Sequence, residues 1–554
     1  MSQLSHTNEK ALISVEERVR STDGSLLLLL KKYAHIIVGA FVFVLAIIFC
    51  FHKLGVPSIW FDEAFSVELA RQPLPLLWHL ITGSEPNMEL YYFVLHFWLQ
   101  LTSLFGLHQT EFIVRFPSAL SASCAALLVY VLGRHYIGLI GGCLAAILYI
   151  FNVLQLTYAQ QTRGYALQSL LLCLSFFALL QAILGQKHYV RWWIVYTLAA
   201  ALSVYAHLFS FLVLFAQAVA IAGILIVPNT WQQQARQQFK AMLISAVALG
   251  VFSVPMLILT RHGSKTGWLP IPHLHDIYGL FQTFSGNEKF YLYGLLACIG
   301  VGIVIALASY ILRIEPQLHK RITRQNASLD TLFAQENLLP WLWLLLCWLV
   351  IPIVASYIVS HGATRLFSSR YLVVVLPALF LLVASGVVAL RNRGVQALLI
   401  IELIFLAYTT VPQYYRSAQV EDWNSTSAWL TQHYHTGDGL VCYDNIQGCQ
   451  ISMEYYLHAY PTDGVQFTAD SPGFFSWQKY NWNDAGQALD TQKLAVYGTK
   501  HGHIFFIVAR LSSNESVARV HTTEQWLDTH FRYSDQIVTP TITIRLYDTS
   551  SSLP

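Results

Sequence analysis

The sequence has few charged residues for its length. Of 554 residues, 11% are charged and 55% are hydrophobic, and the mean hydropathy is +0.49. A single soluble domain of this size would expose far more polar surface, so the composition excludes a soluble enzyme and a disordered protein. Basic patches with interleaved aromatic residues are missing outside short loops, which excludes a nucleic-acid-binding module. We therefore predict a polytopic membrane protein.

Cysteine is also scarce. Eight cysteines are too few for a disulfide scaffold, and no CxxC or Cys/His spacing suggests zinc. Six of them lie in apolar runs, where a thiol behaves as a small hydrophobic group. The other two, Cys442 and Cys449, flank a turn-like DNIQG in the polar tail. We predict a disulfide between them, and two free thiols are the alternative.

The net charge of +3 conceals a division of the chain. Residues 413–554 carry 8 Lys and Arg against 14 Asp and Glu, a net charge of −6, and the rest carries 25 against 16, a net charge of +9. The tail is therefore predicted to be a soluble domain and residues 34–412 a transmembrane domain. Residues 1–33 are polar and mixed in charge, unlike a cleavable signal, and are expected to be a cytoplasmic segment.

Eleven apolar segments are long enough to cross about 30 Å of hydrocarbon, which takes roughly 20 residues each. A twelfth, 90–105, is short and interrupted by His96 and Gln100, so we predict an interfacial helix there. It belongs to the first outer loop, 53–112. The eleven predicted spans are 34–52, 113–133, 138–156, 164–184, 190–206, 208–227, 240–260, 291–312, 339–359, 370–390 and 395–411.

The distribution of basic residues predicts the orientation. With eleven spans and a cytoplasmic N terminus, 16 Lys and Arg fall on the inside, and nine fall in the outer loops beside eight acids. Counting 90–105 as a span would send the later basic loops outward. The odd number therefore fits better, and it puts the tail outside the cytoplasm. Within the tail, helical spacing over 421–434 and strand-like runs at 439–444, 503–510 and 541–548 predict a small α/β domain.

Ionisable residues gather at the outer ends of the predicted spans, where charge is costly unless it serves a site or a partner. In SIWFDEAFSVELA (58–70), Asp62 and Glu63 are adjacent acids between aromatic residues. Such a pair is a base poised by burial and like charge, a pair of ligands for a divalent metal, or merely negative charge at a helix N terminus. The sequence leaves these alternatives open.

The next two stretches also belong to the outer face. GSEPNMELYYFVLHFW (83–98), with Asn87 and Tyr91, predicts an amphipathic aromatic helix that forms either a lipid-facing groove or a surface anchor. In EFIVRFPSAL (111–120), Glu111 and Arg115 are four residues apart. They either pair with each other on one helix face, or Arg115 contacts a phosphate.

Arginines at two further outer boundaries suit a phosphate. YAQQTRGYAL (158–167) contains Arg163 and Tyr165, and RLFSSRYLVVVLPAL (365–379) contains Arg370. Snorkelling of the arginines to the interface is the alternative. His207 lies between two spans that meet with almost no loop, and it is either a further site residue or a satisfied core histidine.

A carboxylate pair, several arginines and an apolar groove on one face fit the transfer of a sugar from a polyprenyl phosphate to a hydroxyl. The leaving phosphate is already a stable anion and needs cations, whereas the incoming hydroxyl needs a base. A glycosidase would need two carboxyl groups on opposite sides of the sugar, and the sequence shows no distinct second acid with neighbours that suit this role.

These stretches resemble the GT-C membrane glycosyltransferases related to protein O-mannosyltransferases and aminoarabinose transferases. The resemblance covers most of residues 58–386 in the expected order, and it lies in the order and spacing of the motifs together. Its motifs are WFDEAFS (60–66), EPNMELYYFVLHFW (85–98), EFIVRFPSAL (111–120), YAQQTRGYAL (158–167), YAHLFSFLVLFAQ (205–217), SSRYLVVVLPALFLLVASG (368–386) and the Asp422-Trp423 start of the tail.

The resemblance implies a fold of about eleven transmembrane helices, juxtamembrane helices in the first outer loop, and a polyprenyl-phosphate sugar donor. It implies that Asp62 is the catalytic base with Glu63 beside it. It further implies that Arg115, Arg163 and Arg370 bind the donor phosphate. The chain departs from many relatives at Glu85–Met88, where they have a His-Pro-Pro stretch, and at Gln161, where they have an acid before the arginine.

The sequence thus predicts an inverting integral membrane glycosyltransferase of a bacterial plasma membrane, acting on its extracytoplasmic side. A secondary transporter and a polysaccharide-export or scaffold protein without catalysis are the alternatives. The expected partners are the lipid-linked donor, an acceptor protein, lipid or glycan, and membrane lipids, without nucleic acid. No cofactor is assigned, and a divalent cation stays open. Further site candidates are Glu111, Asn87, Tyr91, Tyr165 and His207.

Overall fold

The computed structural model describes residues 33–550 apart from 86, 186–187, 260–265, 316–336, 444–446, 463, 482–486 and 512. The predicted cytoplasmic segment 1–33 lies outside the described residues except for its last residue. So do several basic residues assigned to the inner loops, namely Lys187, Lys320, Arg321 and Arg324.

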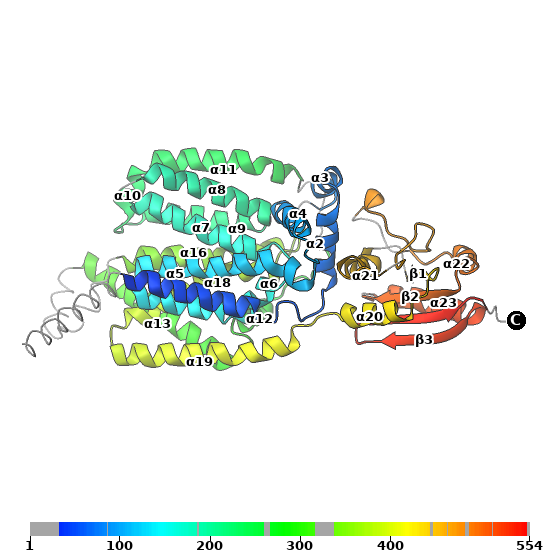
Figure 1. Cartoon of the computed structure of the whole chain (residues 1–554). Coiled ribbons are helices and arrows are strands. Elements are labelled where there is room, and N and C mark those ends of the chain that lie inside the picture. Colours follow the sequence, from blue (N-terminus) through cyan, green and yellow to red (C-terminus); the bar gives the residue numbers. More distant parts are fainter. Residues whose placement is uncertain are drawn as a thin grey trace, which may run out of the picture.

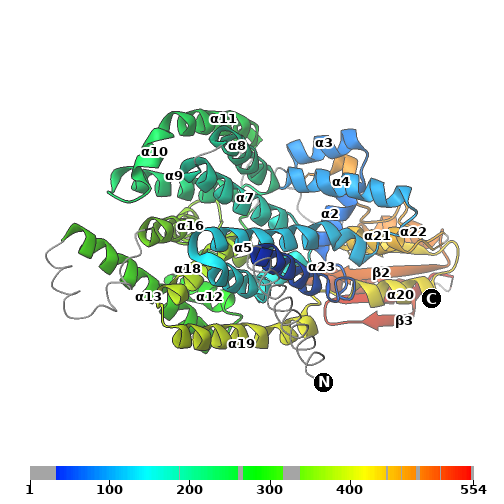
Figure 2. The same ribbon diagram turned by 60° about the vertical axis from the view of Figure 1, so that its left-hand side comes forward.

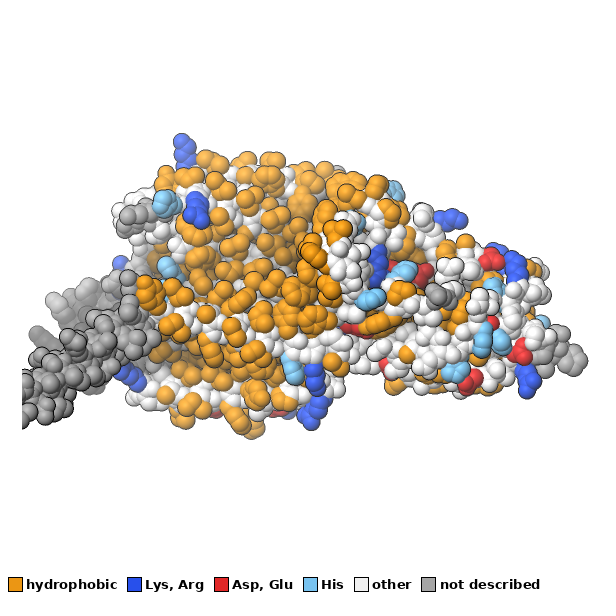
Figure 3. Space-filling model, viewed as in Figure 1, with side chains coloured by type: hydrophobic (Ala, Val, Ile, Leu, Met, Phe, Trp, Pro, Cys, Tyr) orange, Lys and Arg blue, Asp and Glu red, His pale blue; other side chains and the backbone are white. Residues whose placement is uncertain are grey.

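The predicted apolar segments form a bundle of long helices (Figure 1). On the face shown in Figure 3, hydrophobic side chains predominate over the bundle, whereas the tail shows a mixture of hydrophobic, charged and other side chains. The helices are Tyr33–Phe51, α5 (Glu111–Ile150), α7 (Tyr165–Leu184), α8 (Tyr189–Ala206), α9 (Ser210–Ile226), α11 (Phe239–Leu259), α13 (Lys289–Ile314), α16 (Leu338–Val359), α17 (Ser369–Leu372), η2 (Val373–Val375), α18 (Leu376–Ala389) and α19 (Arg393–Ser417). Three short helices, α6 (Val153–Ala159), α10 (Gln232–Gln237) and α12 (Leu274–Phe284), lie between them.

Eight helices among the described residues are long and apolar enough to cross a membrane. The chain is therefore an integral membrane protein, but the number of eleven spans is not confirmed. Two of the predicted spans, α8 and α9, are too short or too polar to be counted, although both are helical. Two others are joined in α5, which is continuous in hydrogen bonding but not straight.

The chain turns back on itself within α5. Gly138 has a φ of 86°, in the left-handed region that glycine adopts without strain. Gly133 and Gly142 would lie about 13 Å apart along a straight helix, yet a Cβ added to Gly133 would come within 2.6 Å of the Gly142 Cα. The two arms of α5 therefore form a tight antiparallel hairpin, as the two predicted segments 113–133 and 138–156 require.

Three helices between the first bundle helix and α5 lie across one end of the bundle. They are α2 (Phe61–Arg71), α3 (Leu74–Gly83) and α4 (Glu89–Leu104). Figure 1 shows α3 and α4 nearly end-on where the bundle helices run lengthwise, and Figure 2 shows the same three helices beside the tail domain. α4 is the helix predicted at 90–105, and it is not among the helices that could span a membrane. The loop thus forms a layer between bundle and tail.

The tail folds into a small α/β domain, as predicted. Its four-stranded sheet has the order β1-β2-β4-β3, with β1 parallel to β2 and the other pairs antiparallel. The strands are β1 (Gly439–Cys442), β2 (His503–Ala509), β3 (Arg532–Val538) and β4 (Ile542–Asp548), and the helices are α20 (Trp423–His433), α21 (Gln447–Ala459), α22 (Thr491–Gly498) and α23 (Asn514–His530). The predicted disulfide between Cys442 and Cys449 is present and ties the end of β1 to α21.

Glycine residues allow the backbones of two central helices of the bundle to pack closely against each other. A Cβ added to Gly302 of α13 would lie 3.0 Å from the Cα of Gly386 in α18, and a Cβ on Gly386 would overlap the carbonyl of Cys298. Small residues allow such close approach of helices in a membrane. All but one of the residues of α18 are buried, so this helix lies at the centre of the bundle.

We expect Gly386→Ala to lower the free energy of unfolding by about 1–3 kcal/mol, because the added methyl group overpacks the α13–α18 contact. The measurement is the apparent unfolding temperature of the purified protein in detergent. Gly300→Ala in α13 is the control, since an added Cβ there meets nothing within 4 Å. Equal unfolding temperatures for the two variants would contradict the packing described.

Candidate active site

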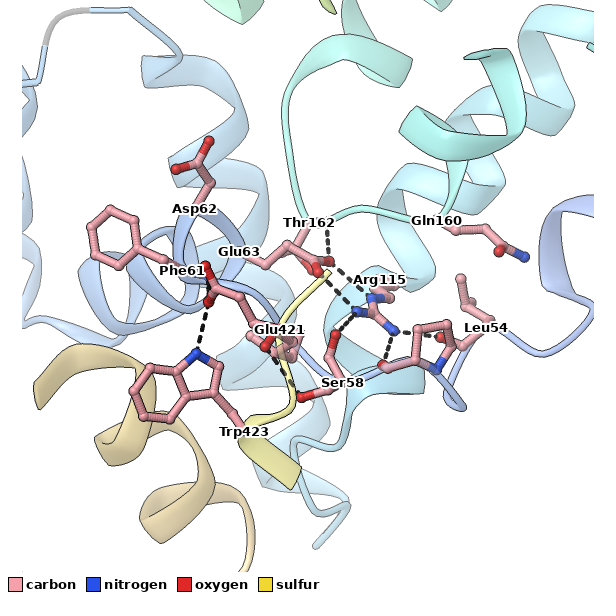
Figure 4. Close-up of polar contacts among 12 residues, drawn as sticks. Leu54, Ser58, Phe61, Asp62, Glu63, Arg115, Gln160, Thr162, Glu421 and Trp423 are labelled. Atoms are coloured by element: carbon pink, nitrogen blue, oxygen red, sulfur yellow. Dashed lines mark hydrogen bonds and ion pairs between the residues drawn. The ribbon is translucent and has the colours of Figure 1, made fainter. Parts of the chain in front are cut away.

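A buried ion pair anchors the start of α2. The Arg115 Nε donates to Glu63 Oε1 over 2.9 Å and its Nη2 donates to Oε2 over 2.8 Å, so the contact is bidentate (Figure 4). Both side chains are almost completely buried. Asp62 and Glu63 both lie in the first turn of α2, where negative charge is favourable, but only Glu63 turns toward the bundle.

The remaining donors of Arg115 are used by the backbone. Nη1 donates to the carbonyls of Leu54 and Pro57, and Nη2 also donates to the carbonyl of Ser58. All five N–H groups of the guanidinium are therefore occupied. One expectation is corrected by this geometry, because Arg115 pairs with Glu63 and not with Glu111. The assignment of Arg115 to the donor phosphate stays a prediction, and every N–H of its guanidinium has a partner within the chain.

Glu63 also orders the loop before α7. Its Oε1 accepts the backbone N–H of Thr162 over 2.8 Å. The same loop is held at Gln160, whose amide donates to the carbonyls of Cys50 and His52 at the end of the first helix. These contacts fix the position of Arg163, which follows Thr162 in the loop.

Asp62 lies beside Glu63 in sequence but points away from it (Figure 4). Its carboxylate is 20% exposed, and Oδ2 lies 3.4 Å from Nη1 of Arg370. The two acids therefore do not form a common ligand pair for a metal. Glu63 is buried and paired with Arg115, and Asp62 is the more exposed of the two acids.

Arg163 approaches the same side of α2. Its Nη1 donates to the backbone carbonyl of Asp62 over 3.2 Å and to the hydroxyl of Ser66 over 3.1 Å. Its Nε is buried and has no hydrogen-bond partner in the described part of the chain. Burial would lower the pKa of this guanidinium, but Asp62 raises the pKa above its ordinary value. Arg163 is thus a cation with an unused donor beside the accessible acid.

Arg370 begins the segment that leads into α18. Besides its contact with Asp62, its guanidinium lies 5.0 Å from the centre of the Trp268 ring, a cation–π contact. Pro377, at the start of α18, lacks an N–H, and the turn before it tightens into the 3-10 helix η2. Arg370 therefore lies at the end of the bundle, before α18, and not in the interior of the bundle.

Aromatic rings line the space next to the two arginines. Tyr165 contacts Tyr158, with ring centres 4.8 Å apart, and His207, with ring centres 5.3 Å apart. His207 in turn lies 5.1 Å from Tyr371. Tyr165 and His207, predicted from different span ends, are brought together here.

His207 is neutral in this setting. Burial, followed by the nearby Arg163 and Arg370, lowers the pKa of its imidazole to about 3. Its Nδ1 accepts the backbone N–H of Phe209 over 3.1 Å, so the proton resides on Nε2. This Nε2 is buried without a hydrogen-bond partner in the described residues. His207 is therefore a neutral donor facing the arginine side of the site.

The tail domain completes the frame from the other side. The hydroxyl of Tyr456 accepts the backbone N–H of Ile59 over 2.9 Å, and a carboxylate oxygen of Glu421 accepts the N–H of Phe61 over 3.0 Å. Glu421 is held by the indole of Trp423, which donates to it over 2.7 Å (Figure 4). The segment that carries Asp62 is thus fixed by the bundle and by the tail together.

The other predicted candidates support the site rather than line it. The hydroxyl of Tyr91 hydrogen-bonds to that of Ser118, which donates to the carbonyl of Arg163. Glu111 accepts from the hydroxyl of Tyr460 and so contacts the tail domain. Asn87 lies in the turn before α4, and its backbone N–H donates to the carbonyl of Glu85.

Several residues of the site were not singled out from the sequence. Trp268 lies in a loop without a recognisable motif, and Ser66 is an ordinary small residue within α2. Glu421 and Tyr456 belong to the tail, whose acidic composition pointed only to a soluble domain. The rings of Tyr158 and Tyr371 fall within the quoted motifs but carry no charge that would mark them.

Comparison with known proteins identifies the fold. A family model described as dolichyl-phosphate-mannose-protein mannosyltransferase matches residues 92–258. The crystal structure of ArnT from Cupriavidus metallidurans in the apo state matches with a TM-score of 0.58 and 10% identity, covering 92% of this chain and 97% of that one. The chain shares the fold of ArnT. The GT-C fold predicted from the sequence is thus confirmed.

A second structure of the same protein, bound to undecaprenyl phosphate, matches with a TM-score of 0.55, again with 10% identity and coverage of 92% and 97%. No curated protein sequence matches the chain. The likeness to ArnT extends over the bundle and the tail domain, since only 8% of this chain lies outside it.

A second ionisable cluster lies where α2 contacts α21. Glu68 of α2 is buried and pairs with Arg71 and with His458, whose Nδ1 is 2.9 Å from Glu68 Oε2. The hydrogen bond that His458 donates to the carboxylate of Glu68 raises the pKa of His458. Burial, followed by the charge of Glu68, raises the pKa of Glu454 to about 7. Burial would also raise the pKa of Glu68, but Arg71 and His458 lower it.

This cluster makes the stability of the folded chain depend on pH. A raised folded-state pKa, as at His458 and Glu454, gives stability that is present at low pH and lost as the pH rises through that pKa. We expect the apparent unfolding temperature to fall as the pH rises from about 5.5 to 8, and Glu454→Gln to flatten this fall. Glu515→Gln, an exposed acid on α23, is the control. An unchanged slope in Glu454→Gln would contradict the assignment.

The two adjacent acids should differ sharply on neutralisation. Glu63→Gln leaves the Arg115 charge buried without its partner, and we expect a loss of about 3–5 kcal/mol in the free energy of unfolding. Asp62→Asn, one residue away and partly exposed, should leave the unfolding temperature near that of the wild type. Comparable destabilisation by both changes would contradict the division of roles between Glu63 and Asp62.

Proposed function

We propose that the chain is an integral membrane glycosyltransferase that moves a sugar from a polyprenyl-phosphate donor to an acceptor hydroxyl on the extracytoplasmic side. One observation carries the proposal. Asp62 is a partly exposed carboxylate between two arginines, Arg163 and Arg370, on a segment that is rigidly held. A base beside cations is the combination that this reaction needs.

In the proposed step Asp62 accepts the proton of the acceptor hydroxyl. The acceptor oxygen forms a bond to the anomeric carbon of the donor sugar while the bond from that carbon to the phosphate oxygen breaks. The electron pair leaves with the polyprenyl phosphate. Attack from the face opposite the leaving group inverts the anomeric centre, so no covalent sugar–enzyme intermediate is needed.

The arginines are assigned to the leaving phosphate. Arg163 offers its unused Nε–H, and the planar guanidinium suits phosphate oxygens. Arg370 pairs with Asp62 in the absence of substrate, over 3.4 Å. A bound phosphate would compete for Arg370 and release Asp62 to act as a base. The neutral Nε2–H of His207 adds a donor to the same side.

Arg115 is assigned a positioning role in place of the phosphate contact. It holds Glu63 and the backbone of residues 54–58, and so sets the direction of Asp62 without touching a substrate. The side chains of Asp62 and Glu63 therefore have different functions, the first chemical and the second structural.

The comparisons support the choice of donor. The matching family model is described by a dolichyl-phosphate-mannose donor, and one of the ArnT structures is bound to undecaprenyl phosphate. The bias of basic residues toward the opposite end of the bundle supports the extracytoplasmic side. A transporter would concentrate polar groups near the midplane, whereas here they gather at one end of the helices.

We expect Asp62→Asn to reduce sugar transfer at least about 1,000-fold, because the acceptor hydroxyl loses its base. Arg163→Gln and Arg370→Gln should each reduce it about 10–100-fold, because the leaving phosphate loses a cation. The measurement is loss of sugar from a panel of radiolabelled polyprenyl-phosphate sugars incubated with purified protein and membrane extract as acceptor source.

Glu288→Gln is the matched control, since it removes an exposed acid at the start of α13, away from the α2 segment. Each variant is compared at equal amounts of folded protein, judged by its unfolding temperature. Turnover of Asp62→Asn at the wild-type rate would refute Asp62 as the base. Consumption of no donor by the wild type would favour a transporter or a scaffold.

A further inference from the structure

Two histidines and an aspartate converge at the edge of the tail domain, away from α2. They are His435, Asp438 and His503, and one ligand atom from each lies within 4.8 Å of the others. None of them contacts the residues of the candidate active site in the described part of the chain. No Cys or Cys/His spacing in the sequence marks this group as a zinc site.

The sheet holds the three residues in place. Asp438 directly precedes β1 and His503 begins β2, and these strands pair in parallel with Gly439 opposite Ile504. Asp438 and His503 are thus neighbours by register. His435 is brought back by a turn in which its backbone N–H donates to Asp438 Oδ2 over 2.8 Å. The arrangement does not depend on long flexible connections.

The ligand atoms lie close enough together for one metal ion to contact all three residues. Bonds of about 2.0–2.1 Å at tetrahedral angles put neighbouring ligand atoms about 3.3 Å apart. The His503 Nδ1 lies 3.0 Å from Asp438 Oδ1, and the His435 Nδ1 lies 3.6 Å from Oδ2. The two imidazole rings are tilted toward each other with centres 5.8 Å apart.

Charge gives an independent reason for a cation here. The Asp438 side chain is only 4% exposed, and no Lys or Arg pairs with it among the described residues. A buried carboxylate is costly unless a positive charge compensates it. Its two partners are histidines, which supply a charge only when protonated, whereas a divalent metal would supply it with both imidazoles neutral.

A third histidine supports the turn. His501 Nδ1 donates to the carbonyl of Gly437 over 2.6 Å, so the residue next to Asp438 is tied to the start of β2. Support of this kind, just outside the ligands, fixes a metal site. The exposed ring of His435 leaves the remaining coordination position open to water.

We propose that His435, Asp438 and His503 bind one divalent first-row transition metal, with Zn²⁺ as the preferred ion. Imidazole nitrogen and a carboxylate are ligands that suit zinc, and three protein ligands leave one position for water. The metal cross-links the turn before β1 to the start of β2 and so stabilises this edge of the tail domain. This site is independent of sugar transfer at Asp62.

The test uses the full chain purified in detergent, treated with a chelator and then freed of it. Titration with Co²⁺ should give visible absorption typical of a low-symmetry cobalt site at one ion per chain, and Zn²⁺ should abolish it by competition. Zn²⁺ should also raise the apparent unfolding temperature, because it binds the folded form. Both readouts are independent of catalytic activity.

Two variants probe the ligands separately. His435→Ala removes an exposed ring and should fold normally, and His503→Gln keeps a polar side chain at the start of β2. Each should weaken Zn²⁺ binding at least about 10-fold. His433→Ala is the control, because this nearby histidine at the end of α20 lies outside the group and faces Asp535.

Unchanged Zn²⁺ affinity in both ligand variants would overturn the proposal, as would an equal loss in His433→Ala. Absence of any Zn²⁺ effect on the wild-type absorption and unfolding temperature would also overturn it, and Asp438 would then be merely a hydrogen-bond acceptor for two histidines.

Discussion

The buried pair between Glu63 and Arg115 is the constraint on which the rest of the site depends. The five N–H groups of Arg115 and the two carboxylate oxygens of Glu63 bring together the end of the first helix, the first turn of α2, the start of α5 and the loop before α7. A buried ion pair contributes little net stability, but it is costly to break, and it permits one geometry only. The direction of Asp62 follows from that geometry.

The site is composite. Bundle residues fix one side of the segment that carries Asp62, and Tyr456 and Glu421 of the tail fix the other. Neither part alone provides both sets of contacts. The layer formed by α2, α3 and α4 lies between the bundle and the tail (Figure 1). The position of Asp62 in α2 therefore depends on the tail as well as on the bundle.

Much of the fold could be predicted from the sequence, because apolar length and charge bias are local signals. The membrane character, a helix at 90–105 that is not counted as a span, the α/β tail and the disulfide were all accessible in this way. The number of eleven spans is not confirmed, because α8 and α9 are not among the helices that are both long and apolar enough to cross a membrane; α9 is apolar but has only 17 residues. β3 escaped prediction because nearly every residue in it is exposed, so it shows no alternation of apolar and polar side chains.

The candidate site was predictable only in part. Asp62, Arg163 and Arg370 are charges at span ends, and the structure brings them together. The role of Arg115 was not predictable, because helical spacing offered Glu111 as its partner, whereas its true partner is 52 residues away in sequence. Helix periodicity gives no information on such a contact, which depends on how α2 lies across the bundle.

The pair formed by Asp62 and Arg370 spans 308 residues of sequence. During synthesis the acid therefore emerges long before the arginine that faces it, and the tail residues that fix its backbone emerge later still. The nascent chain carries Asp62 through most of its assembly without the partners that define its surroundings. The surroundings of Asp62 are therefore complete only after Tyr456 of the tail has been synthesised.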